Sequence, residues 1–499
     1  MKSWNQIYLY IKEEIIDIKG KVPPFLGKIS LDSRKIESGD IFFAFPGTRE
    51  DGKKYIPDAI NKGAQVIFYE GDLSSSFYAE EILFVKVKDI FKSLGIVASA
   101  LYDFPAQRLK IIGVTGTNGK TTVTNLLYHF WNQKGLKAGL IGTIEYRIDE
   151  EVFSSNFTTP QPHELQDLLR KMVDKNITHV AMEVSSHALS LKRIEGVNFC
   201  GTVFTNLTQD HLDFHKTMED YFQAKLRIFD YLIPSGFSIL NKDNEWTKKV
   251  DLKDKKVYWV SLYDSNMEIF LRKDISNEKG MYLEIGTPKG IVHIDTKLRG
   301  RFNIYNILFA VGTLVAMDED IGLIGNYLST FPGVKGRLEF INDGQPFNVI
   351  VDYAHTPDGL QNLLETVSEF NKGKKIVVFG CGGDRDPTKR DKMGSIAAKL
   401  SDFIILTSDN PRTEDPMKII KDIEVGVKNE SFSDYIIIEN REEAIKTAIE
   451  MAEEGDTVVI AGKGHENYQI IGDKRFPFSD QDIARKYIKR KLTKNESYC

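Results

Sequence analysis

The sequence predicts an α/β protein of three domains: a small N-terminal α/β domain at residues 1–103, a central domain at 104–335 and a C-terminal domain at 336–499. Two observations predict this class. A glycine-rich loop joins an apolar strand to a helix early in the central domain. Farther along, short apolar strands end in polar loops and alternate with helical segments, a pattern typical of parallel sheets covered by helices. A chain of 499 residues is long enough for about three domains.

The glycine-rich loop has the residues of a phosphate-binding loop. It follows the apolar strand 110–112 and precedes apolar residues at helical spacing. Such a loop points backbone N–H groups at an anion, while a lysine reaches the β- or γ-phosphate and a threonine hydroxyl binds Mg²⁺. Val114 stands where the usual pattern has glycine, so this is a variant. We predict a P-loop ATPase-like central sheet, with ATP bound by Gly116, Thr117, Asn118, Gly119, Lys120, Thr121 and Thr122.

Composition argues against several classes of protein. The net charge of -5 gives no general attraction to nucleic acid. The three cysteines are too scattered for a disulfide framework or a thiolate metal site, which fits a reduced cytoplasm. No apolar run is long enough for a membrane span. Residues 1–20 include Glu13 and Glu14 among apolar residues, so we predict an amphipathic helix and not a signal peptide.

Two polar clusters of the central domain follow apolar strands. Glu183 lies at the end of strand 178–184, a position that suits an Mg²⁺ ligand in a P-loop enzyme. Strand 201–206 is followed by a segment that contains His211 and His215. Two histidines four residues apart could bind zinc, but a phosphate site favours Mg²⁺, whose coordination one histidine can complete. We assign His211 to that site and expect His215 to be a hydrogen-bonded helix cap.

The last third of the chain repeats the strand-and-loop pattern. Strands are predicted at 349–351, 375–379, 403–406 and 457–460, and each ends in a polar loop. This pattern predicts an open, Rossmann-like sheet with ligands at the carboxyl ends of its strands. A dinucleotide is not expected, because Arg385 stands where the glycine motif needs its third glycine.

Charged side chains in two of these loops suit an amino-acid ligand. Arg385 and Arg412 could bind a carboxylate through bidentate hydrogen bonds. Asp409 could hold an ammonium group, and Asn410 offers both a donor and an acceptor. The alternative is a loop held together by ion pairs, and the residue types alone leave both interpretations open.

These motifs, in this order, resemble the Mur ligase family of peptidoglycan synthesis, over nearly the whole chain. The family has the same variant P-loop, which accounts for Val114. Each further match is weak by itself, but the ordered set is specific. The matching segments are 183–187, 205–207, 210–213, 300–303 with Asn306, 336–339 and 352–355.

The resemblance implies roles for individual residues. Lys120, Glu183, His211 and Lys225 would be catalytic, and Thr121, Glu183, His211 and Lys225 would hold Mg²⁺. Lys225, otherwise a surface helix lysine, matches the family's carbamylated lysine, whose carbamate supplies an anionic oxygen ligand. ATP would also contact Asn303, Asn306, Arg337 and Asp352. The substrate UDP-MurNAc-L-Ala-D-Glu would contact Ser33, Thr158, Thr159, Ser185 and Arg193, although Leu191 replaces a glutamine that the family expects.

The segment from Asp409 through Asn410 and Pro411 to Arg412 matches the pattern that the family associates with meso-diaminopimelate. The residue chemistry agrees, because diaminopimelate carries a second carboxylate and lysine does not. A buried arginine facing lysine would lack an anion. The residues that would recognise the distal amino-acid head are Arg385, Asp409, Asn410, Pro411, Arg412, Gly462 and Glu466.

The resemblance thus implies an ATP-dependent amide ligase. The D-glutamate carboxylate would attack the γ-phosphate, and an amine of diaminopimelate would then attack the resulting acyl phosphate. We expect a cytoplasmic monomer with Mg²⁺ as cofactor and no nucleic-acid or membrane partner. One alternative is a sister ligase that adds lysine or ornithine, or glutamate to a folate. The others are a P-loop switch driven by nucleotide and a nucleotide-binding scaffold without turnover.

Overall fold

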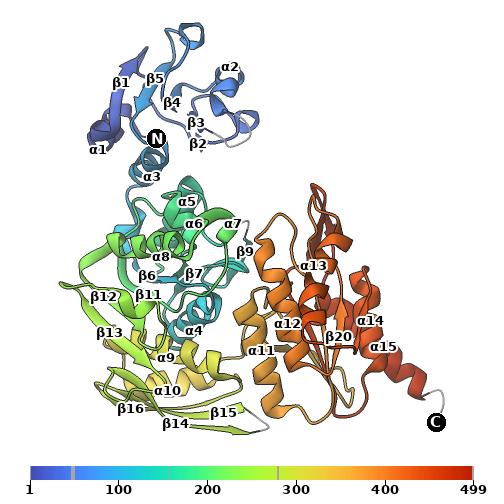
Figure 1. Ribbon diagram of the computed structural model, residues 1–499. Coiled ribbons are helices and arrows are strands. Elements are labelled where there is room, and N and C mark those ends of the chain that lie inside the picture. The colour runs from blue at the N-terminus through green and yellow to red at the C-terminus, as the bar shows by residue number, and fades with distance from the viewer. Residues whose placement is uncertain (1, 47–50, 156, 278–279, 497–499) are drawn as a thin grey trace. The chain divides into compact units, whose positions relative to one another are not determined.

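A computed structural model of the protein describes residues 2–46, 51–155, 157–277 and 280–496 (Figure 1). By internal contacts the chain divides into two units. The division falls within the predicted central domain, so the predicted domain boundaries stay a prediction. The first unit comprises Met1–Gly113, Leu136–Cys200 and Arg227–Ile233, and the second comprises Val114–Gly135, Gly201–Leu226 and Pro234–Cys499.

The N-terminal part of the first unit is a sheet with helices on both faces. Its elements are α1 (Trp4–Ile11), β1 (Ile15–Lys19), β2 (Ile29–Ser30), β3 (Ile41–Ala44), α2 (Ile56–Asn61), β4 (Val66–Glu70), β5 (Leu83–Val87) and α3 (Ile90–Leu101). The strand order is β1-β5-β4-β3-β2, and only the β1–β5 pair is antiparallel. Strand residues alternate between the faces: Phe43 and Phe68 belong to the core with α1 and α3, whereas Phe42 and Ile67 belong to the core with α2.

The amphipathic helix predicted for residues 1–20 is wrong in its second half. Helix α1 ends at Ile11, and β1 follows at Ile15–Lys19. The register of β1 against β5 shifts between Ile15 and Asp17. This irregularity lets Ile15 and Ile18, three residues apart, both pack on the core. Their spacing therefore imitates a helix although the backbone is extended.

The rest of the first unit surrounds β10, which ends at Glu183. Its elements are β7 (Ala138–Ile141), β8 (Glu145–Ile148), β9 (Glu151–Ser154), α5 (Pro162–Asp174), β10 (His179–Glu183) and α6 (Ser186–Ser190). Strand β10 is parallel to β7, whereas β8 and β9 add an antiparallel hairpin to β7. Leu165 and Leu169 of α5 pack with Val180 and Met182 of β10 in one core. The strand predicted before the Glu183 loop is therefore confirmed.

The second unit begins at Val114, so it contains the glycine-rich loop and the helix that follows it. Its elements up to residue 329 are α4 (Lys120–Gln133), α7 (Leu212–His215), α8 (Met218–Leu226), β13 (Lys256–Ser261), β14 (Ile269–Asn277), β15 (Gly280–Thr287), β16 (Gly290–Thr296), α9 (Arg301–Ala316) and α10 (Ile321–Ser329). Strands β6 (Lys110–Thr115), β11 (Phe199–Phe204) and β12 (Leu232–Asn241) cross the division between the units. β12, β13 and β14 are parallel, as predicted, and β15 and β16 are antiparallel additions at the edge.

The C-terminal part of the second unit is the predicted Rossmann-like sheet. Its elements are β17 (Glu339–Phe340), β18 (Asn348–Asp352), α11 (Pro357–Phe370), β19 (Lys375–Phe379), α12 (Arg390–Leu400), β20 (Phe403–Leu406), α13 (Pro416–Asn429), β21 (Tyr435–Ile437), α14 (Arg441–Met451), β22 (Thr457–Ala461), β23 (Tyr468–Ile471), β24 (Lys474–Pro477) and α15 (Asp480–Glu496). The strand order is β17-β18-β22-β19-β20-β21, and only β17 is antiparallel to its neighbour.

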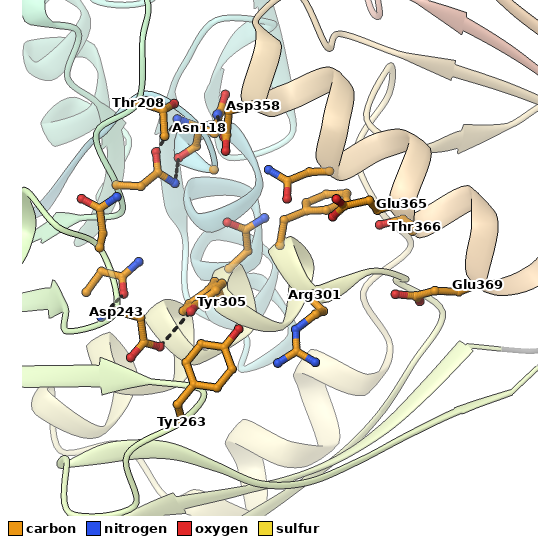
Figure 2. A pocket seen from close by; sticks show the side chains of 17 residues that line it. Asn118, Thr208, Asp243, Tyr263, Arg301, Tyr305, Asp358, Glu365, Thr366 and Glu369 are labelled. Carbon is orange, nitrogen blue, oxygen red and sulfur yellow. Dashed lines mark hydrogen bonds between the residues drawn. The ribbon is translucent and has the colours of Figure 1, made fainter. Parts of the chain in front are cut away.

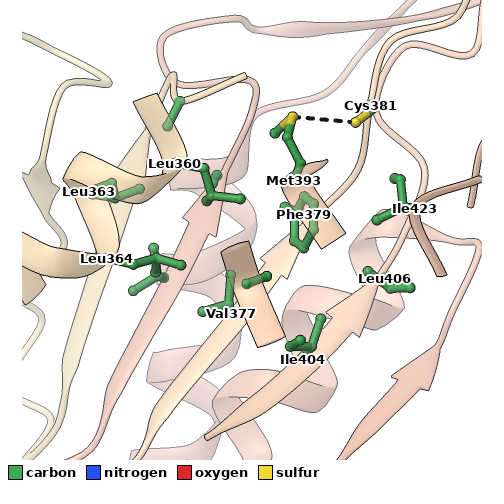
Figure 3. Close-up of a cluster of buried hydrophobic side chains, with 14 of the residues drawn as sticks. Leu360, Leu363, Leu364, Val377, Phe379, Cys381, Met393, Ile404, Leu406 and Ile423 are labelled. Carbon is green, nitrogen blue, oxygen red and sulfur yellow. Dashed lines mark hydrogen bonds between the residues drawn. The ribbon is translucent and has the colours of Figure 1, made fainter. Parts of the chain in front are cut away.

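Both faces of this sheet are covered by helices. Val377 and Phe379 of β19 share a core with residues of α11, α12 and α13 (Figure 3). Ile376 and Val378, the alternate residues of the same strand, share a second core with α14 and α15. Burial on both sides explains why these strands are uninterrupted apolar runs, the signal that predicted them. The polar loops at their carboxyl ends are thereby held at one edge.

Candidate active site

The phosphate-binding loop of the second unit depends on two glycines. Gly116 and Gly119 have φ values of 142° and 90°, a region that favours glycine. A Cβ on Gly119 would lie 2.4 Å from Oδ1 of Asn306, so α9 packs closely against the loop. Helix α4 begins at the next residue, Lys120, whose Nζ donates to the carbonyls of Gly116 and Thr117 at 2.9 and 3.0 Å. The loop therefore has the geometry of an anion cradle at a helix N-terminus.

The segment after β11 braces this loop. Thr205 Oγ1 donates to the carbonyl of Asn118 at 2.6 Å, and Asn206 Oδ1 accepts from the Asn118 N–H at 2.9 Å. The Thr117 N–H donates to the Asn206 carbonyl at 3.0 Å. Residues 205–207 match the family in sequence, but the match alone predicted no role for them. Their role in the structure is to fix the backbone of the loop.

A pocket of about 70 Å³ brings the loop together with residues predicted to bind ATP. It is lined by Asn118, Gly119, Thr121 and Thr122 of the loop and helix start, and by Asn306, Arg337 and Asp352, among others. Asn303 does not line this pocket. It lies behind Asn306, whose Nδ2 donates to Asn303 Oδ1 at 3.0 Å. In this arrangement Asn303 orients Asn306.

Arg337 and Asp352 form one wall of that pocket. Arg337 Nη2 donates to Thr121 Oγ1 at 3.3 Å, and its guanidinium lies 4.6 Å from the centre of the Tyr353 ring. Asp352 accepts from the N–H groups of Leu338 and Ala354 at 2.6 and 2.7 Å. Burial raises the pKa of Asp352 despite the nearby Arg337. Because each carboxylate oxygen keeps a lone pair, Asp352 can still accept a hydrogen bond from a ligand hydroxyl.

A larger cavity of about 330 Å³ lies beside Asn118, Gly119 and Asn306 (Figure 2). Asn118 Nδ2 donates to Asp358 Oδ2 at 2.7 Å, which connects the loop to α11 of the Rossmann-like sheet. On the other side, Tyr305 OH donates to Asp243 Oδ2 at 2.7 Å. The sequence motifs did not single out Asp243, Tyr305 or Asp358. The position of Asp243 just after an apolar strand was the available signal.

Asp210 joins two parts of the second unit. Its carboxylate lies 3.3 Å from His211 Nε2, 3.7 Å from His355 Nε2 and 3.8 Å from Lys389 Nζ. Burial alone would raise the pKa of Asp210, but His211, His355 and Lys389 together lower it well below its usual value. The neighbouring Gln209 donates to Thr388 Oγ1 at 2.9 Å. The loop after β11 thus contacts both the phosphate-binding loop and the Rossmann-like sheet's loops.

Lys225 is buried, which corrects the expectation of a surface lysine from residue pattern alone. Its side chain is 1% exposed, and Nζ donates to the Gly116 carbonyl at 2.9 Å. Burial, together with the Lys120 ammonium, lowers the pKa of Lys225 well below its usual value. A buried amine whose pKa is lowered therefore lies under the phosphate-binding loop. Within the second unit, the structure brings Lys120, Thr121 and Lys225 to one end of α4.

In the first unit, Glu183 and three predicted substrate residues form one cluster. Thr143 donates to both oxygens of Glu183, from N and Oγ1, each at 2.9 Å. The Thr143 hydroxyl also lies 3.0 Å from Thr158 Oγ1. Thr159 Oγ1 donates to the Glu183 carbonyl and accepts from the Ser185 N–H. Thr143 was not predicted, and it follows a strand, as the other site residues do.

Two other predicted substrate residues of the first unit are Arg193 and Ser33. Arg193 Nη1 donates to the Thr159 carbonyl at 3.4 Å, and the guanidinium lies 5.0 Å from the centre of the Phe157 ring. Its Nε is buried without a hydrogen-bond partner among the described residues, so Arg193 has donor capacity for an anion. Ser33 is buried in a short helical turn capped by Asp32, apart from the Arg193 cluster in sequence.

The predicted amino-acid site lies at the carboxyl ends of β19, β20 and β22. Arg412 has φ 52°, and its Nη1 donates to the Gly383 carbonyl at 2.8 Å. Burial and repulsion by the neighbouring Arg385 lower the pKa of Arg412. The same repulsion favours an anion between the two cations. Asn410 Nδ2 donates to Glu466 Oε2 at 2.9 Å. The site therefore combines cationic donors with a carboxylate acceptor, as a zwitterion requires.

Gly462 fits the same site because of its backbone. Its φ is 115°, and a Cβ there would lie 2.6 Å from Asp409 Oδ2. Pro411 and Asp409 are buried beside it, and Arg385 is exposed. The structure thus brings all seven predicted amino-acid-binding residues to one edge of the sheet.

No group of three or more histidine, cysteine, aspartate or glutamate side chains forms a metal cluster within the described residues. The predicted Mg²⁺ ligands are of another kind, because they include a threonine hydroxyl and a lysine carbamate as well as histidine and glutamate. The donor chemistry fits, because burial lowers the pKa of the Lys225 amine and so favours its neutral form, which is the form that can become an oxygen-donating carbamate.

Three family models match successive parts of the chain. They are described as the Mur ligase family, catalytic domain, at residues 27–102, the Mur ligase middle domain at 114–314, and the Mur ligase, glutamate ligase domain, at 336–464.

Curated relatives and solved structures match nearly the full length. Relatives from Clostridium botulinum and Trichormus variabilis are 42% and 43% identical, over 97% and 94% of this chain and 97% and 96% of theirs. Both are named UDP-N-acetylmuramoyl-L-alanyl-D-glutamate--2,6-diaminopimelate ligase. A solved structure of a ligase with that name is 32% identical, covers 98% of this chain and 99% of its own, and has a TM-score of 0.68. A MurF ligase from Thermotoga maritima in complex with ADP, 17% identical over 94% of this chain and 98% of its own with a TM-score of 0.65, shares the fold.

Proposed function

The chain belongs to the Mur ligase family, and on that premise we propose that it joins meso-diaminopimelate to the D-glutamate γ-carboxyl of UDP-MurNAc-L-Ala-D-Glu, using ATP. The observation that carries the choice of amino acid is the Arg412 site. Its guanidinium lies with Asn410 and Glu466 at the end of a parallel sheet. Arg412 suits the second carboxylate of diaminopimelate, and Glu466 suits the ammonium beside it.

ATP is assigned to the pockets around the phosphate-binding loop. The loop and Lys120 would hold the phosphates, and Arg337 and Asp352 would hold the sugar side. The larger cavity beside Asn306 has room for the base. Its wall carries Asp243, Asp358 and Glu365, which disfavour phosphate and leave the loop as the place for negative charge.

Within the second unit, Thr121, His211 and a carbamate on Lys225 would hold Mg²⁺, and Glu183 stays the Mg²⁺ ligand predicted in the first unit. The neutral Lys225 amine can attack CO₂, which forms an N–C bond and releases one proton. Bound Mg²⁺ neutralises charge on phosphate oxygens and polarises them. The carbamate is supported by the burial of Lys225 beneath the loop and by the lowered pKa of its amine.

The muramoyl dipeptide is assigned to the first unit. Thr158, Thr159, Ser185 and Arg193 share one hydrogen-bonded cluster with Glu183, and Arg193 keeps an unused donor for a substrate carboxylate or phosphate. Ser33 would contact the uridine nucleotide. Leu191, at the end of α6, cannot supply the amide that the family's glutamine would offer.

The reaction has two steps. The D-glutamate carboxylate attacks the γ-phosphorus of ATP, which forms an acyl phosphate and releases ADP. The neutral amine of diaminopimelate then attacks the acyl carbon and loses a proton, an amide bond forms, and phosphate leaves with the C–O bond electrons. Lys120 stabilises charge on the transferring group, and most of the remaining catalysis is positioning.

The proposed cellular location and oligomeric state follow from this chemistry. Use of ATP and a nucleotide-linked precursor supports a cytoplasmic enzyme, and we propose that it acts as a monomer. No helix of the described ranges is both long and apolar enough to cross a membrane.

The test is the substrate dependence of ADP release. ADP release should continue beyond one turnover only when the uridine-linked dipeptide and diaminopimelate are both present, and Lys120→Ala should remove the activity. ATP turnover that ignored both substrates would instead favour a nucleotide-driven switch. Faster turnover with lysine or ornithine than with diaminopimelate would favour a sister ligase.

A further inference from the structure

Lys463 is a fully buried lysine beside the amino-acid site. It follows β22, and its side chain is 0% exposed. A buried ammonium is costly unless hydrogen-bonded partners compensate it. Its Nζ donates to Glu466 Oε2 at 2.8 Å and to Asn410 Oδ1 at 3.0 Å. Both partners are predicted amino-acid-binding residues, whereas Lys463 itself was assigned no role.

The three side chains close a triangle of hydrogen bonds. Asn410 Nδ2 donates to the same oxygen of Glu466 at 2.9 Å. Asn410 Oδ1 also accepts from the Ile470 N–H at 2.9 Å. An ammonium and a peptide N–H can only donate, so the side-chain oxygen of Asn410 must face them and its nitrogen must face Glu466. The orientation of the amide is therefore fixed by its surroundings.

The triangle leaves one oxygen of Glu466 for a ligand. Both hydrogen bonds to its carboxylate go to Oε2, and Oε1 accepts none from the described residues. Glu466 interacts electrostatically with Arg412, which belongs to the same site. A zwitterionic head could thus place its carboxylate at Arg412 and its ammonium at Oε1.

The surrounding backbone holds the triangle from both sides. Gln469 Nε2 donates to the Asp409 carbonyl at 2.7 Å, and the Arg412 N–H donates to the Ile470 carbonyl at 3.1 Å. Arg441 is also fully buried and donates to the carbonyl of Ala461 at 3.0 Å, two residues before Lys463. With the backbone fixed, the rotamer of Glu466 depends on its two side-chain donors.

We propose that Lys463 is a positioning residue for amino-acid specificity. It holds Glu466 so that Oε1 accepts from the ammonium of the distal head of diaminopimelate. This inference rests on the proposed function. Without the Lys463 ammonium, Glu466 keeps a single side-chain donor, Asn410, and its carboxylate is no longer confined to one direction.

The test compares two amines in Lys463→Met, which keeps a similar volume and removes the charge. meso-Diaminopimelate has the distal ammonium, and racemic 2-aminopimelate keeps both carboxylates but lacks that ammonium. We expect the KM for diaminopimelate to rise about tenfold while kcat changes less than about threefold, as for loss of one charged hydrogen-bond partner. The KM for 2-aminopimelate should stay within about twofold of wild type. Discrimination between the two amines therefore falls.

Two variants frame this result. Glu466→Gln should reduce discrimination as Lys463→Met does, since both act on the same contact. Lys446→Met, on the surface of α14, where Lys446 pairs only with Glu443 at 3.0 Å among the described residues, should keep wild-type values. Equal KM increases for both amines in Lys463→Met would show a merely structural role and overturn the proposal.

The experiment also covers a variant that fails to fold. Lys463→Gln retains an amide donor for Glu466, so it should keep more discrimination than Glu466→Gln does; equal values would contradict the proposal. If wild type ligated neither amine, the proposed function itself would fail. Wild-type ligation with unchanged discrimination in Lys463→Met would overturn only the role of Lys463.

Discussion

Gly119 is the point where the phosphate-binding loop, α4 and α9 meet. Its positive φ alone would strain another residue, and a Cβ would also collide with Asn306. Gly135, at the other end of α4, has φ 80°, but a Cβ there would have no described atom within 4 Å. A substitution at Gly135 would therefore add backbone strain alone, whereas one at Gly119 would add both strain and a collision at the pocket.

We predict that Gly119→Ala weakens ATP binding at least about tenfold, because the collision displaces Asn306 or the loop. Gly135→Ala should cost about 1 kcal/mol of unfolding free energy and leave ATP affinity unchanged. Titration calorimetry with a non-hydrolysable ATP analogue measures the affinity. Equal losses of affinity in both variants would contradict this account.

The second prediction at the residue scale concerns the carbamate on Lys225. The lowered pKa of the buried Lys225 amine increases the share of its neutral form, and only the neutral form reacts with CO₂. We expect native mass spectrometry in bicarbonate buffer to find the mass of one CO₂ on wild type and none on Lys225→Met. The modification should disappear as the pH falls through the lowered pKa, since the amine is then protonated. Wild type without the added mass would refute the carbamate.

At the scale of elements, the loop after β11 holds the second unit's site together. Thr205 and Asn206 fix the phosphate-binding loop, and Asp210 lies among His211, His355 and Lys389. The lowered pKa of Asp210 means that its ionised form stabilises the fold. This contribution is present above the unfolded-state pKa and is lost as the pH falls toward the folded-state pKa.

We predict that Asp210→Asn lowers the unfolding free energy by about 1–3 kcal/mol at pH 7, because three cationic or protonatable groups lose their anion. The difference from wild type should shrink below pH about 4, where the wild-type carboxyl is protonated in the unfolded chain. Chemical denaturation at several pH values tests this. Asp213→Asn, an exposed neighbour, is the control; a pH-independent difference for Asp210→Asn would argue against the electrostatic cause.

Elements with a clear hydrophobic pattern could be predicted from sequence. Strands β19 and β20 begin and end where their apolar runs do, because both faces are buried. β1 was missed because a register shift spaces its core residues like a helix. The burial of Lys225 and Lys463 could not be predicted either, since it depends on loops that are distant in sequence. The family resemblance supplied a role for Lys225, whereas the contacts of Lys463 could be found only in the structure.

At the scale of the whole molecule, we propose that one chain carries three recognition sites. The first unit contains the cluster around Glu183 and Arg193, and the second contains the phosphate-binding loop and the Arg412 site. Membership of the Mur ligase family explains why one polypeptide needs all three, since an amide ligase must bind an acid, ATP and an amine.

The most direct measurement is the mass of the product formed from ATP, Mg²⁺, UDP-MurNAc-L-Ala-D-Glu and an equimolar mixture of meso-diaminopimelate, lysine and ornithine. The account predicts one dominant product, the dipeptide precursor plus diaminopimelate less one water, with one ADP per product. A dominant lysine or ornithine product, or ADP without any new amide, would contradict it.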